Sequence, residues 1–242
     1  MTSRNPLFVC AAVMLLASTG ASGKLAEGFD DALVAPERPA GDKDRDENRH
    51  PREVLEFGGI GAGMTVLDVA AGSGWYTEVL SAAVGPEGHV IAHNSVQRRA
   101  RVEEAMTARA DRLGNVTPLY AETGAVGLDA EADAALTALN LHDYASRGTD
   151  ALQAFLTDIY AALRPGGVFI VIDHEGSAGN DNSALHRMEL SAARAALEEA
   201  GFVVEAASDI LDNPDDDHSL HMRDESLGRN TDRFLIRARK PE

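Results

Sequence analysis

Short apolar runs rich in β-branched residues alternate with longer segments of helical periodicity, and this alternation constrains the fold more than any other feature. The strand-like runs are 65–69, 89–92, 116–120, 134–139, 168–172, 202–207 and 233–238. The main helix-like segments between them are 75–84, 97–113, 150–163 and 191–200. Strands separated by helices are typical of a mostly parallel sheet that is covered on both faces. The sequence therefore predicts an α/β fold, whose ligands bind beyond the carboxyl ends of the strands.

The turn between the first strand and the helix after it carries the clearest chemical signal, in residues 66–77 (VLDVAAGSGWYT). Small residues let a ligand approach the backbone, and the N-terminus of the following helix offers free N–H groups. A dinucleotide site would need a fuller glycine pattern and an acid at the end of the second strand. Here the acid, Asp68, precedes the glycines, and the second strand ends in His93-Asn94. A tightly packed turn without a ligand is the alternative for an isolated Gly-x-Gly.

This turn resembles motif I of the class I S-adenosylmethionine-dependent methyltransferases, in which an acid is followed by spaced glycines. Asp68, Gly72 and Gly74 match the pattern, and Ala70 replaces its first glycine. The resemblance implies a doubly wound Rossmann-like methyltransferase fold with a mostly parallel seven-stranded sheet and an antiparallel last strand.

Other segments extend the resemblance along the chain. Residues 163–167 (LRPGG) resemble the approach to the fifth strand of that family, and residues 232–236 (DRFLI) resemble its last strand. More narrowly, the chain resembles a bacterial group of predicted, often exported methyltransferases, through residues 72–78, 173–174, 185–187 and 213–218.

The resemblance also implies a site for S-adenosylmethionine. Gly72 and Gly74 would lie under its methionine part, and Asp68 would orient the turn or the amino group. Asn94 stands where the family has an acid on the ribose hydroxyls, and an amide can still donate and accept hydrogen bonds there. The residues expected at the cofactor are Asp68, Ala70, Gly72, Gly74, Trp75, Tyr76, Asn94, Glu122 (adenine edge) and Asn140 (methyl-transfer cleft).

Polar residues follow three of the later strands and are candidates for the acceptor side of the site. The expected catalytic residues are His142, Asp143, Asp173 and His174. Histidine titrates near neutral pH, so His142 or His174 could act as a base that Asp143 or Asp173 orients.

These and neighbouring residues also fit other roles. With Asp217 and His218 the four could also bind a divalent metal, but no pair has a strong metal-ligand spacing and no metal ligand is assigned. The acidic run 215–217 is more typical of a solvated loop. His186 and Arg187 would anchor a loop or bind an anionic group.

The first 23 residues have the layout of a secretory signal. Arg4 is followed by the apolar run 7–17, which is too short to span a bilayer, and then by small residues that offer cleavage after Ala21 or Gly23. The sequence therefore predicts an exported, periplasmic protein without a membrane span after cleavage. Residues 24–50 form a polar N-terminal arm whose charges are expected to be solvated, and residues 51–242 form the methyltransferase-like domain.

Charge limits the partners of this chain. Its 242 residues include 39 acids and 22 Lys or Arg, which gives a net charge of −17. Such an acidic chain is unsuited to nucleic acid or an anionic membrane, so a small-molecule substrate is expected. The oligomeric state is left open. The predicted function is methyl transfer from S-adenosylmethionine to an unidentified small molecule. The alternatives are a non-catalytic ligand-binding protein of the same fold, and a metal-assisted hydrolase or lyase that uses the His/Asp residues at the strand ends.

Overall fold

The computed structural model describes residues 23–122 and 124–242, and a seven-stranded sheet with the order β3-β2-β1-β4-β5-β7-β6 forms its centre. The strands are β1 (Thr65–Val69), β2 (His89–Asn94), β3 (Val116–Tyr120), β4 (Ala132–Ala138), β5 (Leu163–His174), β6 (Val203–Ser208) and β7 (Arg233–Arg239). β7 runs antiparallel to both β5 and β6, and the other pairs are parallel. The expected mostly parallel sheet with an antiparallel last strand is confirmed.

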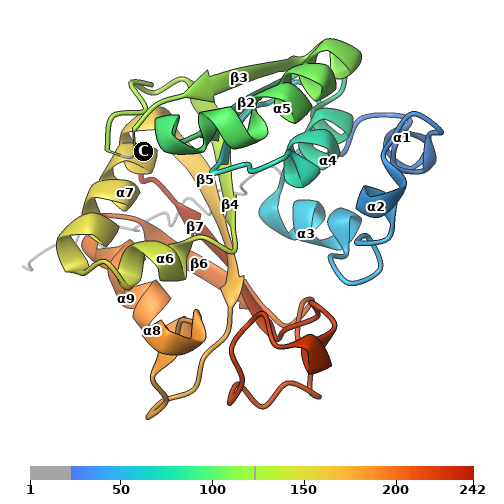
Figure 1. Cartoon of the computed structure of the whole chain (residues 1–242). Coiled ribbons are helices and arrows are strands. Elements are labelled where there is room, and N and C mark those ends of the chain that lie inside the picture. The colour runs from blue at the N-terminus through green and yellow to red at the C-terminus, as the bar shows by residue number, and fades with distance from the viewer. Residues whose placement is uncertain (1–22, 123) are drawn as a thin grey trace, which may run out of the picture.

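Helices cover both faces of this sheet (Figure 1). One face carries α3 (Pro51–Gly58), α4 (Trp75–Val84) and α5 (Arg99–Leu113), and the other carries α6 (Leu141–Ala145), α7 (Thr149–Ala162) and α9 (Leu190–Glu199). Alternate residues of a strand point to opposite faces. In β5, Ile170 and Ile172 therefore join the first core while Phe169 and Val171 join the second. An unbroken apolar run suits this strand because it is buried on both faces.

The order of strands reverses at β1, and this reversal positions the site. The chain leaves β1 through α4 to β2 and β3 on one side, and then crosses to β4 on the other side of β1. In doubly wound sheets, ligands bind in the crevice at such a reversal, outside the carboxyl ends of the strands. Here the crevice lies between the residues that follow β1 and those that follow β4.

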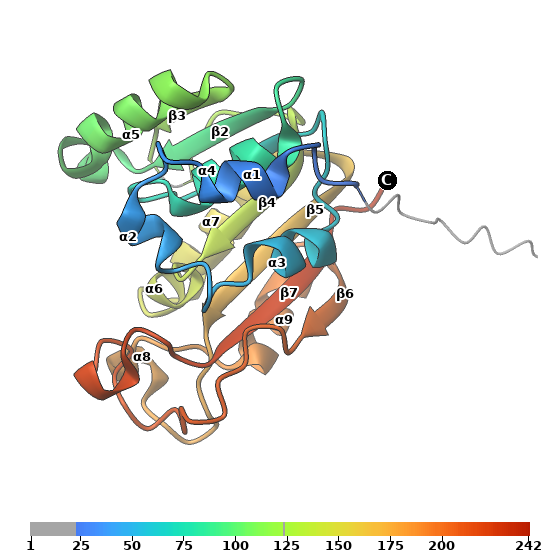
Figure 2. The same cartoon turned by 90° about the vertical axis from the view of Figure 1, so that its right-hand side faces the viewer.

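The N-terminal arm is more deeply packed than the sequence suggested. It contains α1 (Phe29–Val34) and α2 (Ala40–Lys43) and lies across α4 (Figure 2). Arg38 is buried and donates to Asp46, with one hydrogen bond of 2.7 Å, while Asp42 is buried against Arg109. The expectation that the charges of this arm are all solvated is wrong, because these residues form buried ion pairs.

Two short helical turns and one more short helix complete the chain. They are η1 (Val96–Arg98), η2 (Glu225–Leu227) and α8 (Asn182–Leu185). Two long connections, residues 175–189 and 209–232, extend beyond the carboxyl ends of the central strands (Figure 1). Within residues 23–122 and 124–242, no helix combines the length and apolar character needed to cross a membrane. The predicted signal lies almost entirely outside the described residues.

Candidate functional site

The glycine-rich turn after β1 has the backbone of a ligand cradle. Ala70, Gly72 and Gly74 have positive φ angles of 57°, 60° and 93°. A Cβ atom added to Gly72 would meet nothing within 4 Å, whereas one added to Gly74 would lie 2.8 Å from Cδ of Arg109. Gly72 therefore leaves open space beside the backbone, and Gly74 permits close packing against α5.

Asp68 ties this turn to the helix that follows it. Its buried carboxylate accepts a 2.5 Å hydrogen bond from Oγ1 of Thr77, in the first turn of α4. Burial raises the pKa of Asp68 to about 7. The predicted role of orienting the turn fits this contact, and Asp68 also lines the cavity described next.

Two adjoining cavities occupy the crevice at the carboxyl ends of β1 and β4. The smaller, about 210 Å³, is lined by the glycine-rich turn together with Arg49, Trp75 and Tyr76. The larger, about 520 Å³, extends past Glu122. The two cavities share the residues Ala70, Arg98 and Asn140. Of the residues expected at the cofactor, those in or after the turn, β3 and β4 all line one of the two cavities, except Gly74. Gly74 packs against α5 instead.

Asn94 has a different place from the one expected. It is fully buried, its Oδ1 accepts from the Gly72 amide at 2.9 Å, and its Nδ2 donates to the Gly72 carbonyl at 3.1 Å. Both polar atoms of the Asn94 side chain are thus directed at the glycine-rich turn and not at a ribose. The expected ribose contact is corrected to a role in fixing the Gly72 peptide. Ser95, the next residue, lines the larger cavity.

The N-terminal arm supplies cavity residues that the sequence did not reveal. The guanidinium of Arg49 lies 4.7 Å from the centre of the Trp75 ring and 5.8 Å from that of Tyr76. Trp75 Nε1 in turn donates to the Asp42 carbonyl at 2.9 Å. Arg45 and Arg49 therefore line the smaller cavity from the side opposite the sheet. A sequence signal could not identify them, because arginines in a charged arm are usually solvated.

The expected catalytic residues gather beyond the carboxyl ends of β4 and β5. Asp173 is fully buried and accepts from His142 twice, from Nδ1 at 2.6 Å and from the backbone amide at 2.7 Å. Burial alone would lower the pKa of His142, but the hydrogen bond and charge of Asp173 raise it above its ordinary value. The sequence proposed that Asp143 or Asp173 orients a histidine, and the structure shows Asp173 in that position.

His174 is in a different environment although its ring is close. Its Nδ1 is 2.6 Å from Oγ1 of Thr231, and the centres of the His142 and His174 rings are 5.5 Å apart. Burial, reinforced by neighbouring positive charges, holds the pKa of His174 well below its ordinary value. His174 is therefore neutral near pH 7.

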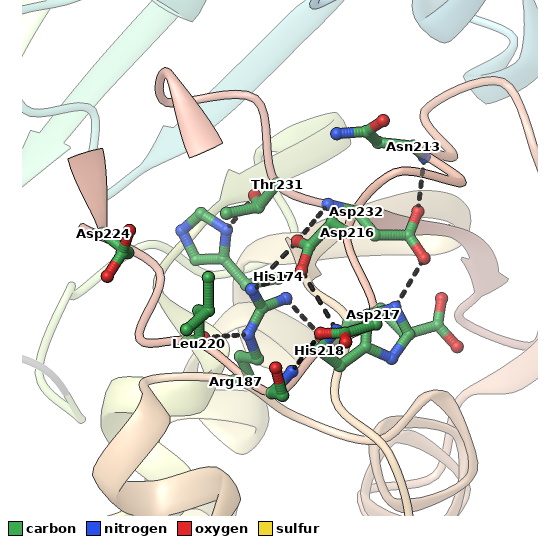
Figure 3. Close-up of polar contacts among 12 residues, drawn as sticks. His174, Arg187, Asn213, Asp216, Asp217, His218, Leu220, Asp224, Thr231 and Asp232 are labelled. Carbon is green, nitrogen blue, oxygen red and sulfur yellow. Dashed lines mark hydrogen bonds and ion pairs between the residues drawn. The ribbon is translucent and has the colours of Figure 1, made fainter. Parts of the chain in front are cut away.

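The acidic loop after β6 does not join this cluster. Asp216 is buried and accepts from Nη2 of Arg187 at 2.9 Å, and His218 contacts Asp232 at 2.7 Å (Figure 3). The expected solvated loop is thus wrong for Asp216 and right for Asp217, which is exposed. The Arg187–Asp216 pair joins residues 175–189 to residues 209–232, whereas the His218–Asp232 pair lies within the second of these segments. Arg187 thus has the anchoring role that the sequence suggested.

Comparison with known proteins agrees with this geometry. A model of the family Protein-L-isoaspartate(D-aspartate) O-methyltransferase matches residues 51–133, from α3 into β4. The ubiquinone/menaquinone biosynthesis C-methyltransferase UbiE of Marinomonas sp. (strain MWYL1) is 32% identical over 123 residues, which are 50% of this chain and 47% of that protein. The chain thus spans about half the length of the curated relatives that it matches.

Solved structures extend the similarity to most of the chain. A SAM dependent methyltransferase from Aquifex aeolicus has a TM-score of 0.63 and 24% identity, covering 81% of this chain and 93% of that one. A possible exported protein from Bordetella parapertussis has a TM-score of 0.57 and 17% identity, covering 91% and 81%. At these identities the likeness concerns the fold. Sequence and structure together confirm the resemblance: this chain has the fold of the class I S-adenosylmethionine-dependent methyltransferases and is similar to methyltransferases in sequence over about half of its length.

Proposed function

We propose that this protein transfers the methyl group of S-adenosylmethionine to a small-molecule acceptor. The observation that carries the proposal is the open space beside Gly72, inside the crevice where the strand order reverses. The family match over residues 51–133 includes the same turn. The positive φ of Gly72 favours glycine by itself, and its position inside the cavity distinguishes it from other glycines with open space beside them.

The cofactor half of the site follows from the two cavities. The methionine part would lie against Gly72 and the start of α4, and its carboxylate would face Arg45 and Arg49. The adenosine part would extend into the larger cavity, toward Ser95 and Glu122. When bound, S-adenosylmethionine supplies an electrophilic methyl group on a sulfonium sulfur. The protein's task is to align that methyl with the acceptor atom.

The acceptor half is built by the segments that follow β4 and β5. Asn140 lines both cavities, and Asp143 and Tyr144 line the larger one beside it. Where the acceptor is a hydroxyl, the predicted role of His142 as a base requires an Nε2 that carries neither a proton nor another ligand, because Asp173 holds the proton on Nδ1. Residues 134–242 lie outside the family match.

Export is part of the same proposal. Residues 1–21 or 1–23 would be removed as a signal, and the mature protein would be periplasmic. The Gly23 amide donates to the Gly59 carbonyl at 3.2 Å, and this contact favours cleavage after Ala21 because it keeps Gly23. Mass spectrometry of the periplasmic fraction tests this: a mature chain beginning at Ser22 supports it, and an uncleaved cytoplasmic chain contradicts it.

Calorimetry with S-adenosylmethionine and S-adenosylhomocysteine tests the cofactor site. Wild type is expected to bind both with one site per chain, and Gly72→Val is expected to abolish binding because the side chain fills the cradle. Gly114→Val is the matched control: Gly114 also has a positive φ, 79°, with open space beside it, but ends α5 away from the cavities. If wild type binds neither ligand, the proposal fails. If Gly72→Val binds as well as wild type, the site is wrong.

A further inference from the structure

The cluster around His142 contains an arrangement that neither proton transfer nor cofactor binding requires. His142 is 3% exposed, and its Nε2 has no hydrogen-bond partner among the described residues. The carboxylate oxygen Oδ1 of Asp143 lies 3.5 Å from this atom, and also 3.3 Å from Nδ1 of His186. One carboxylate oxygen thus stands between two imidazole nitrogens.

The tautomer of His142 indicates which charge this arrangement requires. Asp173 accepts the proton on Nδ1, so a neutral His142 has a lone pair on Nε2. That lone pair would face the Asp143 carboxylate across 3.5 Å without a hydrogen bond. Two electron-rich groups in a buried site repel one another unless a positive charge lies between them. The positive charge is either a second proton on His142 or a cation.

We propose that His142, Asp143 and His186 form a binding site for a divalent first-row transition metal ion. Ligand atoms of the three side chains all lie within 4.8 Å of one another. Two atoms that are each about 2.0–2.1 Å from one tetrahedral ion are about 3.3 Å apart, close to the two separations of 3.5 and 3.3 Å between Asp143 and the imidazole nitrogens. Imidazole nitrogen with one carboxylate is a ligand set suited to zinc, iron or nickel and less suited to calcium or magnesium.

The surroundings of the cluster are those of a built metal site. Asp173 accepts from Nδ1 of His142 and so fixes its ring, as carboxylates often do for the histidines that bind a metal through their other nitrogen. The three residues come from α6 and from the end of α8, so the fold brings together side chains that are more than 40 positions apart. Asp143 also lines the 520 Å³ cavity. Free coordination positions of the ion would therefore lie at the edge of the acceptor side of the crevice.

Metal titration of the untagged, chelator-treated full protein tests the site. Calorimetry with Zn²⁺ is expected to show one ion per chain, and Co²⁺ is expected to give the visible absorption of a coordinated ion. His186→Gln and Asp143→Asn should each weaken Zn²⁺ binding at least tenfold. Both side chains are partly exposed, so the fold should tolerate these changes. Asp173→Asn should weaken binding 10–100-fold through the orientation of His142.

His89→Gln is the matched control, because His89 begins β2 at the opposite end of the sheet from the cluster. It should bind Zn²⁺ as wild type does. Absence of a stoichiometric site, or binding that survives His186→Gln and Asp143→Asn, overturns the metal proposal. His142 would then carry the second proton. Either result leaves the cofactor test at Gly72 untouched, because the glycine-rich turn contributes no ligand to this cluster.

Discussion

At the residue scale, the most informative group in the cofactor half is the buried carboxyl of Asp68. Its carboxylate accepts hydrogen bonds from the side chain and the backbone of Thr77, and burial dominates its titration. Asn94 fixes the Gly72 peptide from the other side of the turn. Together these two residues fix the backbone of the glycine-rich turn. The contacts with a ligand in the cavity would then come from the glycines and from the arm.

Asp68 predicts a pH dependence of stability. A carboxyl whose pKa is about 7 when folded and near 4 when unfolded binds more protons in the folded state between these values. Its contribution is therefore fully present below about pH 4 and is lost as the pH rises to about 7, by about 1.4 kcal/mol per pH unit. Asp68→Asn should remove this slope. Urea unfolding of both proteins from pH 4 to 8 measures it, and parallel profiles would contradict it.

Replacing Gly74 is expected to lower the stability of the protein, separately from any effect on ligand binding. The Cβ of Gly74→Ala would lie 2.8 Å from Cδ and 2.9 Å from Nε of Arg109, at a φ of 93°. Arg109 cannot easily move, because it is buried between Glu78 and Asp42. We expect a loss of about 1–3 kcal/mol in the free energy of unfolding. Gly114→Ala has a similar backbone but open surroundings, and should lose less; equal losses would contradict this account.

At the element scale, the N-terminal arm and the segments that follow the strands surround the crevice. The arm lines the smaller cavity with Arg45 and Arg49, which follow α2. The residue after α8, His186, lies 3.3 Å from Asp143 in α6. None of these elements belongs to the central sheet. The sheet thus determines where the site lies, and the segments outside the sheet determine which side chains line it.

The arm predicts a specific effect on cofactor affinity. Burial lowers the pKa of Arg49, and a carboxylate beside it would compensate for that burial. Arg49→Gln should weaken S-adenosylhomocysteine binding about tenfold or more, since a charge-assisted hydrogen bond contributes about 1.5–3 kcal/mol. Arg52→Gln is the control, because Arg52 pairs with Asp30 and Glu56 on the surface. Equal affinities of the two variants, measured by calorimetry, would rule out a carboxylate contact at Arg49.

The pair Arg187–Asp216 predicts how the two long connections are held together. Both side chains are almost fully buried, at 0% and 1% exposure, and Asp216 also accepts from the amide of Asp232 at 2.8 Å. Arg187→Met leaves a buried carboxylate without its ion partner and should cost about 3–5 kcal/mol. Adding Asp216→Leu should make the total loss smaller than the sum of the two single losses. Additive losses in thermal or urea unfolding would mean that the pair is not coupled.

At the scale of the whole molecule, the proposed cofactor couples binding to global stability. A ligand that binds only the folded state stabilises it by about 2.7 kcal/mol at a hundred times its Kd. For a chain of this size, that is a rise in Tm of about 5–11 °C. Thermal unfolding with S-adenosylhomocysteine should show this rise for wild type and not for Gly72→Val. An equal rise in both would place the ligand elsewhere.

The acidic excess also belongs to this scale. The net charge of −17 arises from 39 acidic and 22 basic residues, while the two cavities are lined by arginine, asparagine, aspartate and glutamate among other residues. The acidic excess predicts weak attraction for polyanions, whereas the cavity lining indicates which groups a ligand would meet.

The sequence by itself determined the order of elements, the doubly wound sheet and the cradle at residues 70–74. These follow from local periodicity and from glycine and proline, which act within a few residues. Pro118, which has no amide hydrogen, suits an edge strand, and its strand β3 lies at the edge of the sheet. The start of β5 was missed by five residues, because Pro165 and the glycines after it interrupt its apolar pattern.

Only the tertiary structure decided which distant side chains meet. The burial of Arg38 and Asp42, the contact of Asn94 with Gly72, and the approach of His186 to His142 all join segments that no short pattern links. Whether a charge is solvated or paired depends on what packs over it, and that is settled by the whole fold. The local sequence therefore determines where the site lies. Contacts between distant segments determine which side chains meet there and what chemistry they can do.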